Sequence, residues 1–75
     1  ANAICLGEVG LGGELRAVSQ LERRLVEASR MGFNLAYIPA QSLPRSTPES
    51  IRVVGCDTLA ELLEQALGPL PGRAD

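Results

Sequence analysis

The 75-residue sequence contains no histidine and no lysine, and its seven basic residues are all arginine. A Ser-His-Asp triad or a Ser-Lys dyad therefore cannot be assembled within this chain. Without histidine, no side chain exchanges protons near neutral pH unless the pKa of a carboxyl group is strongly shifted. We expect that the chain is not an enzyme by itself.

Cysteine is also scarce, with Cys5 and Cys56 as the two examples. Two thiolates without histidine do not complete a structural zinc site, and their spacing fits no redox motif. We interpret them as reduced, buried cysteines in strands of a cytoplasmic protein. No metal and no cofactor is expected in this chain. The sequence also has no apolar run long enough to cross a membrane.

The small size and the negative charge of the chain limit what it can do alone. A core built from 75 residues is marginal. The sequence starts at Ala1 and enters an apolar run almost at once, which we interpret as the mark of a fragment of a longer parent. We expect the isolated chain to self-associate or to be only partly folded. A net charge of −2 predicts weak binding to nucleic acid by the chain alone.

The first part of the sequence predicts a hairpin followed by a helix. Residues 3–9 and 14–18 have the apolar alternation of strands, and the segment Leu11–Gly13 has the paired glycines of a turn. Ser19 and Glu22 fit a capping box at a helix start. The spacing of Leu21, Leu25 and Ala28 gives that helix one apolar face, and Gly32 is suited to end it, with Ala28 and Phe33 as an apolar clasp.

The second part of the sequence predicts two more strands and a second helix. Residues 34–38 and 51–55 are predicted strands, separated by a loop over residues 40–50. Thr58 and Glu61 form a second capping box, and Gly68 with Pro69 ends the helix that follows. We expect the apolar stripe of this helix to belong to the core, with a groove for a partner helix as the alternative; the stripe contains Leu59, Leu62, Leu63, Ala66 and Leu67.

The predicted order is β-β-α-β-β-α, an α+β fold with one face of the sheet covered by helices. Residues 1–68 are expected to form one partial domain, and residues 69–75 are expected to be a flexible tail.

An ordered set of motifs resembles one protein family. Gly7–Leu11 followed by Gly13–Arg16 is similar to the hairpin of Lon-type protease domains, which have the fold of ribosomal protein S5 domain 2. The helix end at Arg30–Phe33, the strand end at Pro39 and the final strand and helix are also similar. Within this group, residues 7–11, 13–16 and 18–24 most resemble the RadA family of bacterial DNA repair proteins. The resemblance covers residues 3–67.

The resemblance places Arg24 at the position of the catalytic lysine of Lon. Arginine stays protonated, so it cannot accept a proton from a serine as a neutral lysine does. The resemblance implies that Arg24 occupies a vestigial active-site position, now used for a carboxylate, phosphate or subunit contact. The alternative is an ordinary arginine whose stem packs while its head reaches water. No catalytic residue is expected in this chain.

The resemblance implies a non-catalytic Lon-like module of a RadA-type ATP-dependent protein that processes branched DNA, with roles in ring-shaped oligomer assembly and duplex contact. ATP with magnesium, and zinc, are implied for the parent. Arg16, Arg23, Arg24 and Arg30 are the candidate DNA-binding residues; for Arg23 and Arg30 the alternative is a solvated face with ion pairs to Glu27. A second hypothesis is the end of a Lon-type Ser-Lys protease, and a third is part of a magnesium-chelatase-like competence protein.

Overall fold

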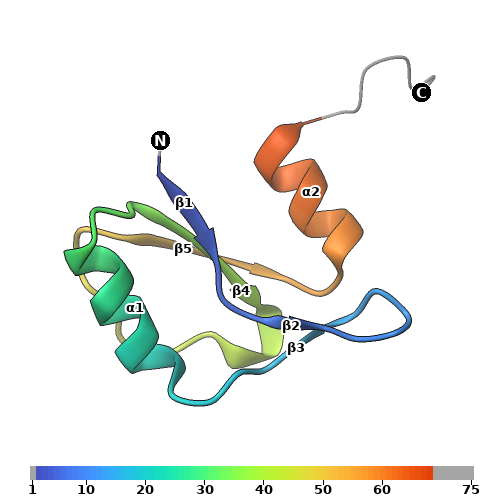
Figure 1. Cartoon of the computed structure of the whole chain (residues 1–75), viewed down its shortest axis with the longest axis horizontal. Helices are drawn as coiled ribbons and strands as arrows, with labels where there is room; N and C mark the ends of the chain where they lie inside the picture. The colour runs from blue at the N-terminus through green and yellow to red at the C-terminus, as the bar shows by residue number, and fades with distance from the viewer. Residues whose placement is uncertain (1, 69–75) are drawn as a thin grey trace.

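The computed structural model describes residues 2–68, which form a three-stranded parallel sheet, a two-stranded antiparallel ribbon and two α-helices (Figure 1). The predicted α+β class is therefore confirmed. The predicted tail, residues 69–75, lies outside the described residues. In chain order the elements are β1 (Ala3–Cys5), β2 (Glu8–Val9), β3 (Leu15–Arg16), α1 (Leu21–Arg30), β4 (Leu35–Pro39), the short 3-10 helix η1 (Ala40–Ser42), β5 (Arg52–Cys56) and α2 (Leu59–Leu67).

The first predicted strand, residues 3–9, is two strands in the structure. β1 pairs in parallel with β4, whereas β2 leaves the sheet and pairs antiparallel with β3, Glu8 opposite Arg16. The break falls at Gly7, where a Cβ atom would lie 3.3 Å from the Pro39 ring. A residue with a side chain would crowd Pro39 at this point, so glycine allows the chain to turn from the sheet into the ribbon.

Helix α1 begins differently from the prediction, and it ends as predicted. Ser19 is not the capping residue: the N-cap is Gln20, in the left-handed region with φ 55°, and it makes no side-chain cap. At the other end, Gly32 has φ 96°. The amides of Gly32 and Phe33 donate to the carbonyls of Ser29 and Ala28, respectively, at 3.1 and 3.0 Å. This pair of bonds is a Schellman motif, so the predicted C-terminal end is confirmed.

The main core lies between α1 and one face of the sheet. Leu25 of α1 is fully buried, together with Ala36 and Ile38 of β4. Ile51, the residue just before β5, packs in the same cluster. The buried residues of α1 recur at helical spacing, and those of β4 at every second position. The apolar side of the helix therefore faces the apolar side of the strand. Over residues 2–68, neither helix has the length and apolar character needed to cross a membrane.

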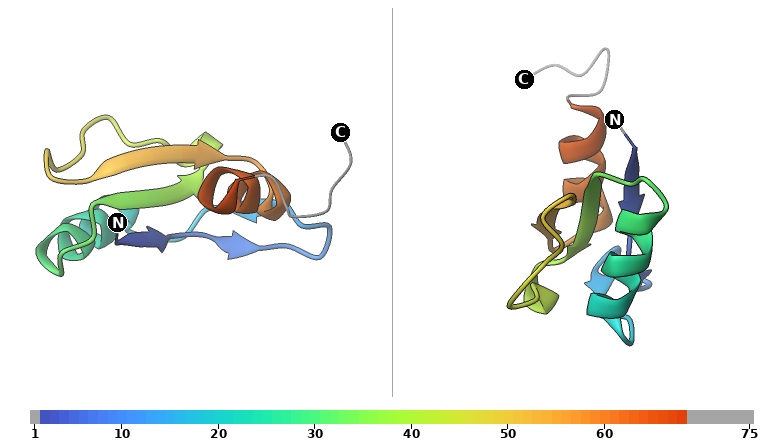
Figure 2. Two further views of the ribbon diagram at one scale, coloured as in Figure 1. Left: turned by 90° about the horizontal axis from the view of Figure 1, so that it is seen from above. Right: turned by 90° about the vertical axis from the view of Figure 1, so that its left-hand side faces the viewer.

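The two helices lie on opposite faces of the sheet, and the prediction that both cover one face was wrong (Figure 1). Ala36 and Ile38 face α1, whereas Tyr37, which points the other way, packs with Leu62 of α2. Alternate residues of one strand point to opposite faces, so the central strand β4 is buried on both sides. Figure 2 shows β4 between the two edge strands, β1 and β5.

The predicted core stripe of α2 is mostly exposed, which corrects the sequence interpretation. Leu62 is buried with 7% of its surface exposed, but Leu59, Leu63 and Leu67 are 37%, 43% and 68% exposed. The start of α2 does follow the prediction: the Thr58 hydroxyl accepts from the Glu61 amide at 3.1 Å. The helix is therefore capped as expected, but it contacts the sheet through the edge of its apolar stripe.

Candidate nucleic-acid interface

Three of the four predicted site residues lie on the solvent side of α1. Arg23 and Arg30 are seven residues apart and share one line along the helix, while Arg24 is about 100° around the axis from Arg23. Leu25 of the core lies opposite Arg23 and Arg30, whereas Arg24, four residues before buried Ala28, lies at the margin of the buried side. All three arginines are exposed. We name Arg23, Arg24, Glu27 and Arg30 the arginine face of α1.

One glutamate interrupts this face. The guanidinium of Arg23 forms an i,i+4 ion pair with the Glu27 carboxylate at 3.4 Å, and the two side chains are 73% and 60% exposed. Such a pair is worth about 0.2–0.5 kcal/mol and is screened by salt, so it breaks readily when a phosphate approaches. Three arginines against one glutamate leave the face with two positive charges.

Arg24 has a structural partner in its own chain. Its Nε donates to the Ser19 carbonyl at 2.8 Å, while its amide donates to the Gln20 carbonyl at 3.0 Å. The arginine thus holds the residue before the left-handed Gln20, which makes no side-chain cap of its own. Sequence reasoning missed this contact because the segment has the pattern of an ordinary capping box.

Arg30 differs from Arg23 and Arg24 because, within residues 2–68, the structure shows neither an ion pair nor a side-chain hydrogen bond for it. It lies in the last turn of α1, where a positive charge interacts favourably with the exposed carbonyls of the helix end. Its guanidinium is exposed to solvent. Within the arginine face, Arg30 is therefore the residue most able to accept a new anionic partner.

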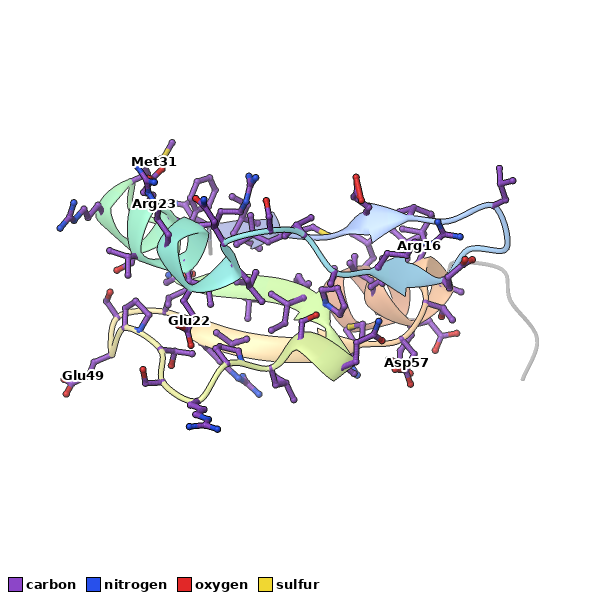
Figure 3. All side chains as sticks on the ribbon, turned by 90° about the horizontal axis from the view of Figure 1, so that it is seen from below. Arg16, Glu22, Arg23, Met31, Glu49 and Asp57 are labelled. Atoms are coloured by element: carbon purple, nitrogen blue, oxygen red, sulfur yellow. The ribbon has the colours of Figure 1, made fainter. Side chains whose placement is uncertain are left out.

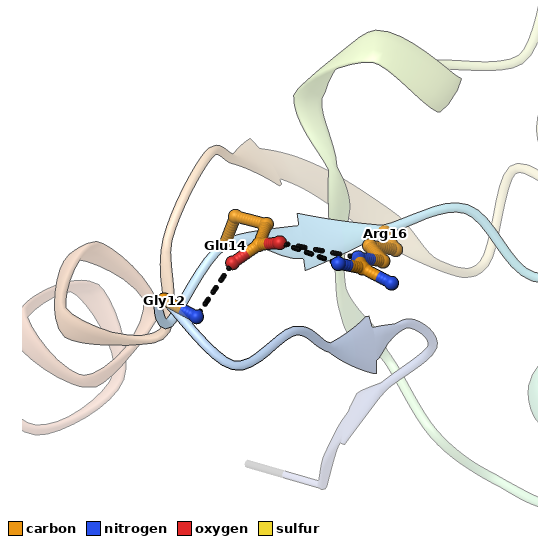
Figure 4. Close-up of polar contacts among 3 residues, drawn as sticks. All are labelled: Gly12, Glu14 and Arg16. Atoms are coloured by element: carbon orange, nitrogen blue, oxygen red, sulfur yellow. Dashed lines mark hydrogen bonds and ion pairs between the residues drawn. The ribbon is translucent and has the colours of Figure 1, made fainter.

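Arg16 lies apart from the other three, at the hairpin end of the molecule (Figure 3). Its guanidinium donates twice to one oxygen of Glu14, at 2.8 and 3.2 Å, and the second oxygen accepts from the Gly12 amide at 3.0 Å (Figure 4). These hydrogen bonds hold the pKa of Glu14 below its usual value, and the bond from Arg16 has the largest effect. The structure therefore assigns Arg16 to the hairpin turn and does not join it to the arginine face.

The two cysteines differ in their surroundings. Cys56 is fully buried at the end of β5, as predicted, but Cys5 is exposed on β1, so that half of the prediction was wrong. Burial raises the pKa of both thiols, and nearby carboxylates add to the effect at Cys56. Both cysteines are free thiols.

Several curated proteins with similar sequences carry the name DNA repair protein RadA. The chain is 47% identical over 64 residues to DNA repair protein RadA of Bacillus subtilis, which is 84% of this chain and 14% of that protein. It is 44% identical over 69 residues to DNA repair protein RadA of Chlamydia pneumoniae, 88% of this chain and 15% of that protein. The RadA protein of Escherichia coli is 38% identical over 60 residues, 80% of this chain and 13% of that protein. No protein-family model matches the chain.

The chain spans about one seventh of the length of these relatives. Within that length the similarity extends through more than four fifths of the chain for the first two relatives. Identity above 40% over such a stretch shows common descent. The chain is thus a homologue of one segment of the bacterial proteins named DNA repair protein RadA.

Proposed function

We propose that this chain is the non-catalytic, Lon-like module of a RadA-type, ATP-dependent DNA repair and recombination protein. The observation that carries the proposal is the 47% identity to a RadA protein over 84% of the chain. In the proposed parent, other segments bind ATP with magnesium, and zinc, and process branched DNA in the cytoplasm. The module adds contacts to duplex DNA and to neighbouring subunits of a ring.

The position of Arg24 supports a module without catalysis of its own. The resemblance to Lon-type domains aligns this residue with a catalytic lysine, and its Nε is held at 2.8 Å from the Ser19 carbonyl. A permanently protonated group that is already hydrogen-bonded to the backbone cannot take a proton from a nucleophile. In the proposed role, Arg24 supports the start of α1, Arg30 meets phosphate directly, and Arg23 does so by exchanging its ion pair with Glu27 for a phosphate.

The arginine face of α1 is the proposed contact to duplex DNA. It is exposed, it bears two net positive charges, and its guanidinium groups can donate paired hydrogen bonds to phosphate oxygens. Contacts of this type position a protein on DNA without reading its sequence. The overall charge of −2 makes the contact weak in the isolated chain, so it acts as an addition to the DNA binding of the parent.

Duplex binding at several salt concentrations tests the contact. The double variant Arg23→Ala/Arg30→Ala should weaken binding of a labelled duplex by the RadA-type parent and reduce the slope of log K against log salt by about 2, because each lost phosphate contact removes about 0.9. Arg16→Ala is the matched control, since this residue is paired with Glu14 at the other end of the fold. Equal effects of both variants, or no effect of the double variant, would contradict the proposal.

The absence of catalysis is tested with the purified chain. We expect neither peptide hydrolysis nor ATP hydrolysis above a buffer blank, because the chain has no lysine and no histidine. If the chain hydrolyses peptides and a serine-directed inhibitor stops this activity, the result would favour a Lon-type protease and refute the proposal of a non-catalytic module.

A further inference from the structure

We draw no further inference here: the strongest candidate, the exposed apolar face of α2 formed by Leu59, Leu63 and Leu67, carries none, because the chain spans about one seventh of the length of its relatives and nothing within residues 2–68 shows what covers this face.

Discussion

Leucine truncation in the two helices gives the sharpest test of which apolar surfaces are buried. Leu25 is fully buried between α1 and β4, whereas Leu63 of α2 is 43% exposed, although both lie on apolar stripes of their helices. Leu25→Ala removes the same atoms as Leu63→Ala but leaves a cavity in the core. We expect Leu25→Ala to lower the free energy of unfolding by about 3 kcal/mol, and Leu63→Ala to lower it by less than about 1 kcal/mol.

Urea unfolding followed by far-UV circular dichroism measures the difference. A small domain has an m-value of about 1 kcal/mol per M urea, so the loss of about 3 kcal/mol moves the midpoint down by about 3 M, or leaves Leu25→Ala unfolded without urea. Leu63→Ala should keep the wild-type midpoint within about 1 M. If Leu63→Ala is as destabilising as Leu25→Ala, the exposed leucines of α2 are covered in solution and the description of its stripe as exposed is wrong.

Three further predictions concern caps, acid and thiols. Thr58→Ala should cost about 1 kcal/mol in urea unfolding, whereas Ser19→Ala should cost almost nothing, because the Thr58 hydroxyl caps α2 and no side chain caps α1. The pKa of Glu14 is lowered in the folded chain, so the ionised carboxylate stabilises the fold above the unfolded pKa, and this stabilisation is lost as the pH falls through the folded pKa. Glu14→Gln should therefore lose less stability than the wild type below pH 4.5, as measured by the urea midpoint at each pH. Iodoacetamide should label Cys5 but not the buried Cys56 in the folded chain, and both in urea, as counted by mass spectrometry; equal native rates would contradict the burial of Cys56.

The elements that local chemistry determines were predictable from the sequence. The ribbon pairs Val9 with Leu15 across a glycine turn, as the alternation indicates. The Schellman end at Gly32 and the cap at Thr58 also follow from residues that are adjacent in sequence. In each case the decisive contacts join residues a few positions apart, so the pattern itself contains the information.

The errors concern long-range packing and one unusual backbone conformation. The wide apolar stripe of α2 predicts burial, but only tertiary contacts decide that Leu62 meets Tyr37 while Leu63 stays exposed. Which face of the sheet each helix covers is likewise decided by tertiary contacts and not by the residues of the helix alone. At α1, the left-handed Gln20 replaces the expected cap at Ser19, a conformation that non-glycine residues adopt rarely and that composition does not signal.

For the candidate site, periodicity was sufficient to group Arg23, Arg24 and Arg30 on one helix. It could not show that Arg16 is paired with Glu14 at the far end of the fold, because the distance between hairpin and helix depends on the whole chain. The parallel pairing of β1 with β4 was also invisible in the sequence, since the alternation predicts one long strand that pairs with the hairpin over its full length.

The hairpin and the start of α2 are joined through their backbones. The Leu59 amide donates to the Gly13 carbonyl at 2.8 Å, and the Leu15 amide donates to the Asp57 carbonyl at 2.9 Å. During synthesis on the ribosome, Gly13 and Leu15 emerge before their partners, so the ribbon lacks these bonds until residues 57–59 have left the exit tunnel. A nascent chain that pauses before residue 59 therefore presents an unfinished hairpin to chaperones and proteases.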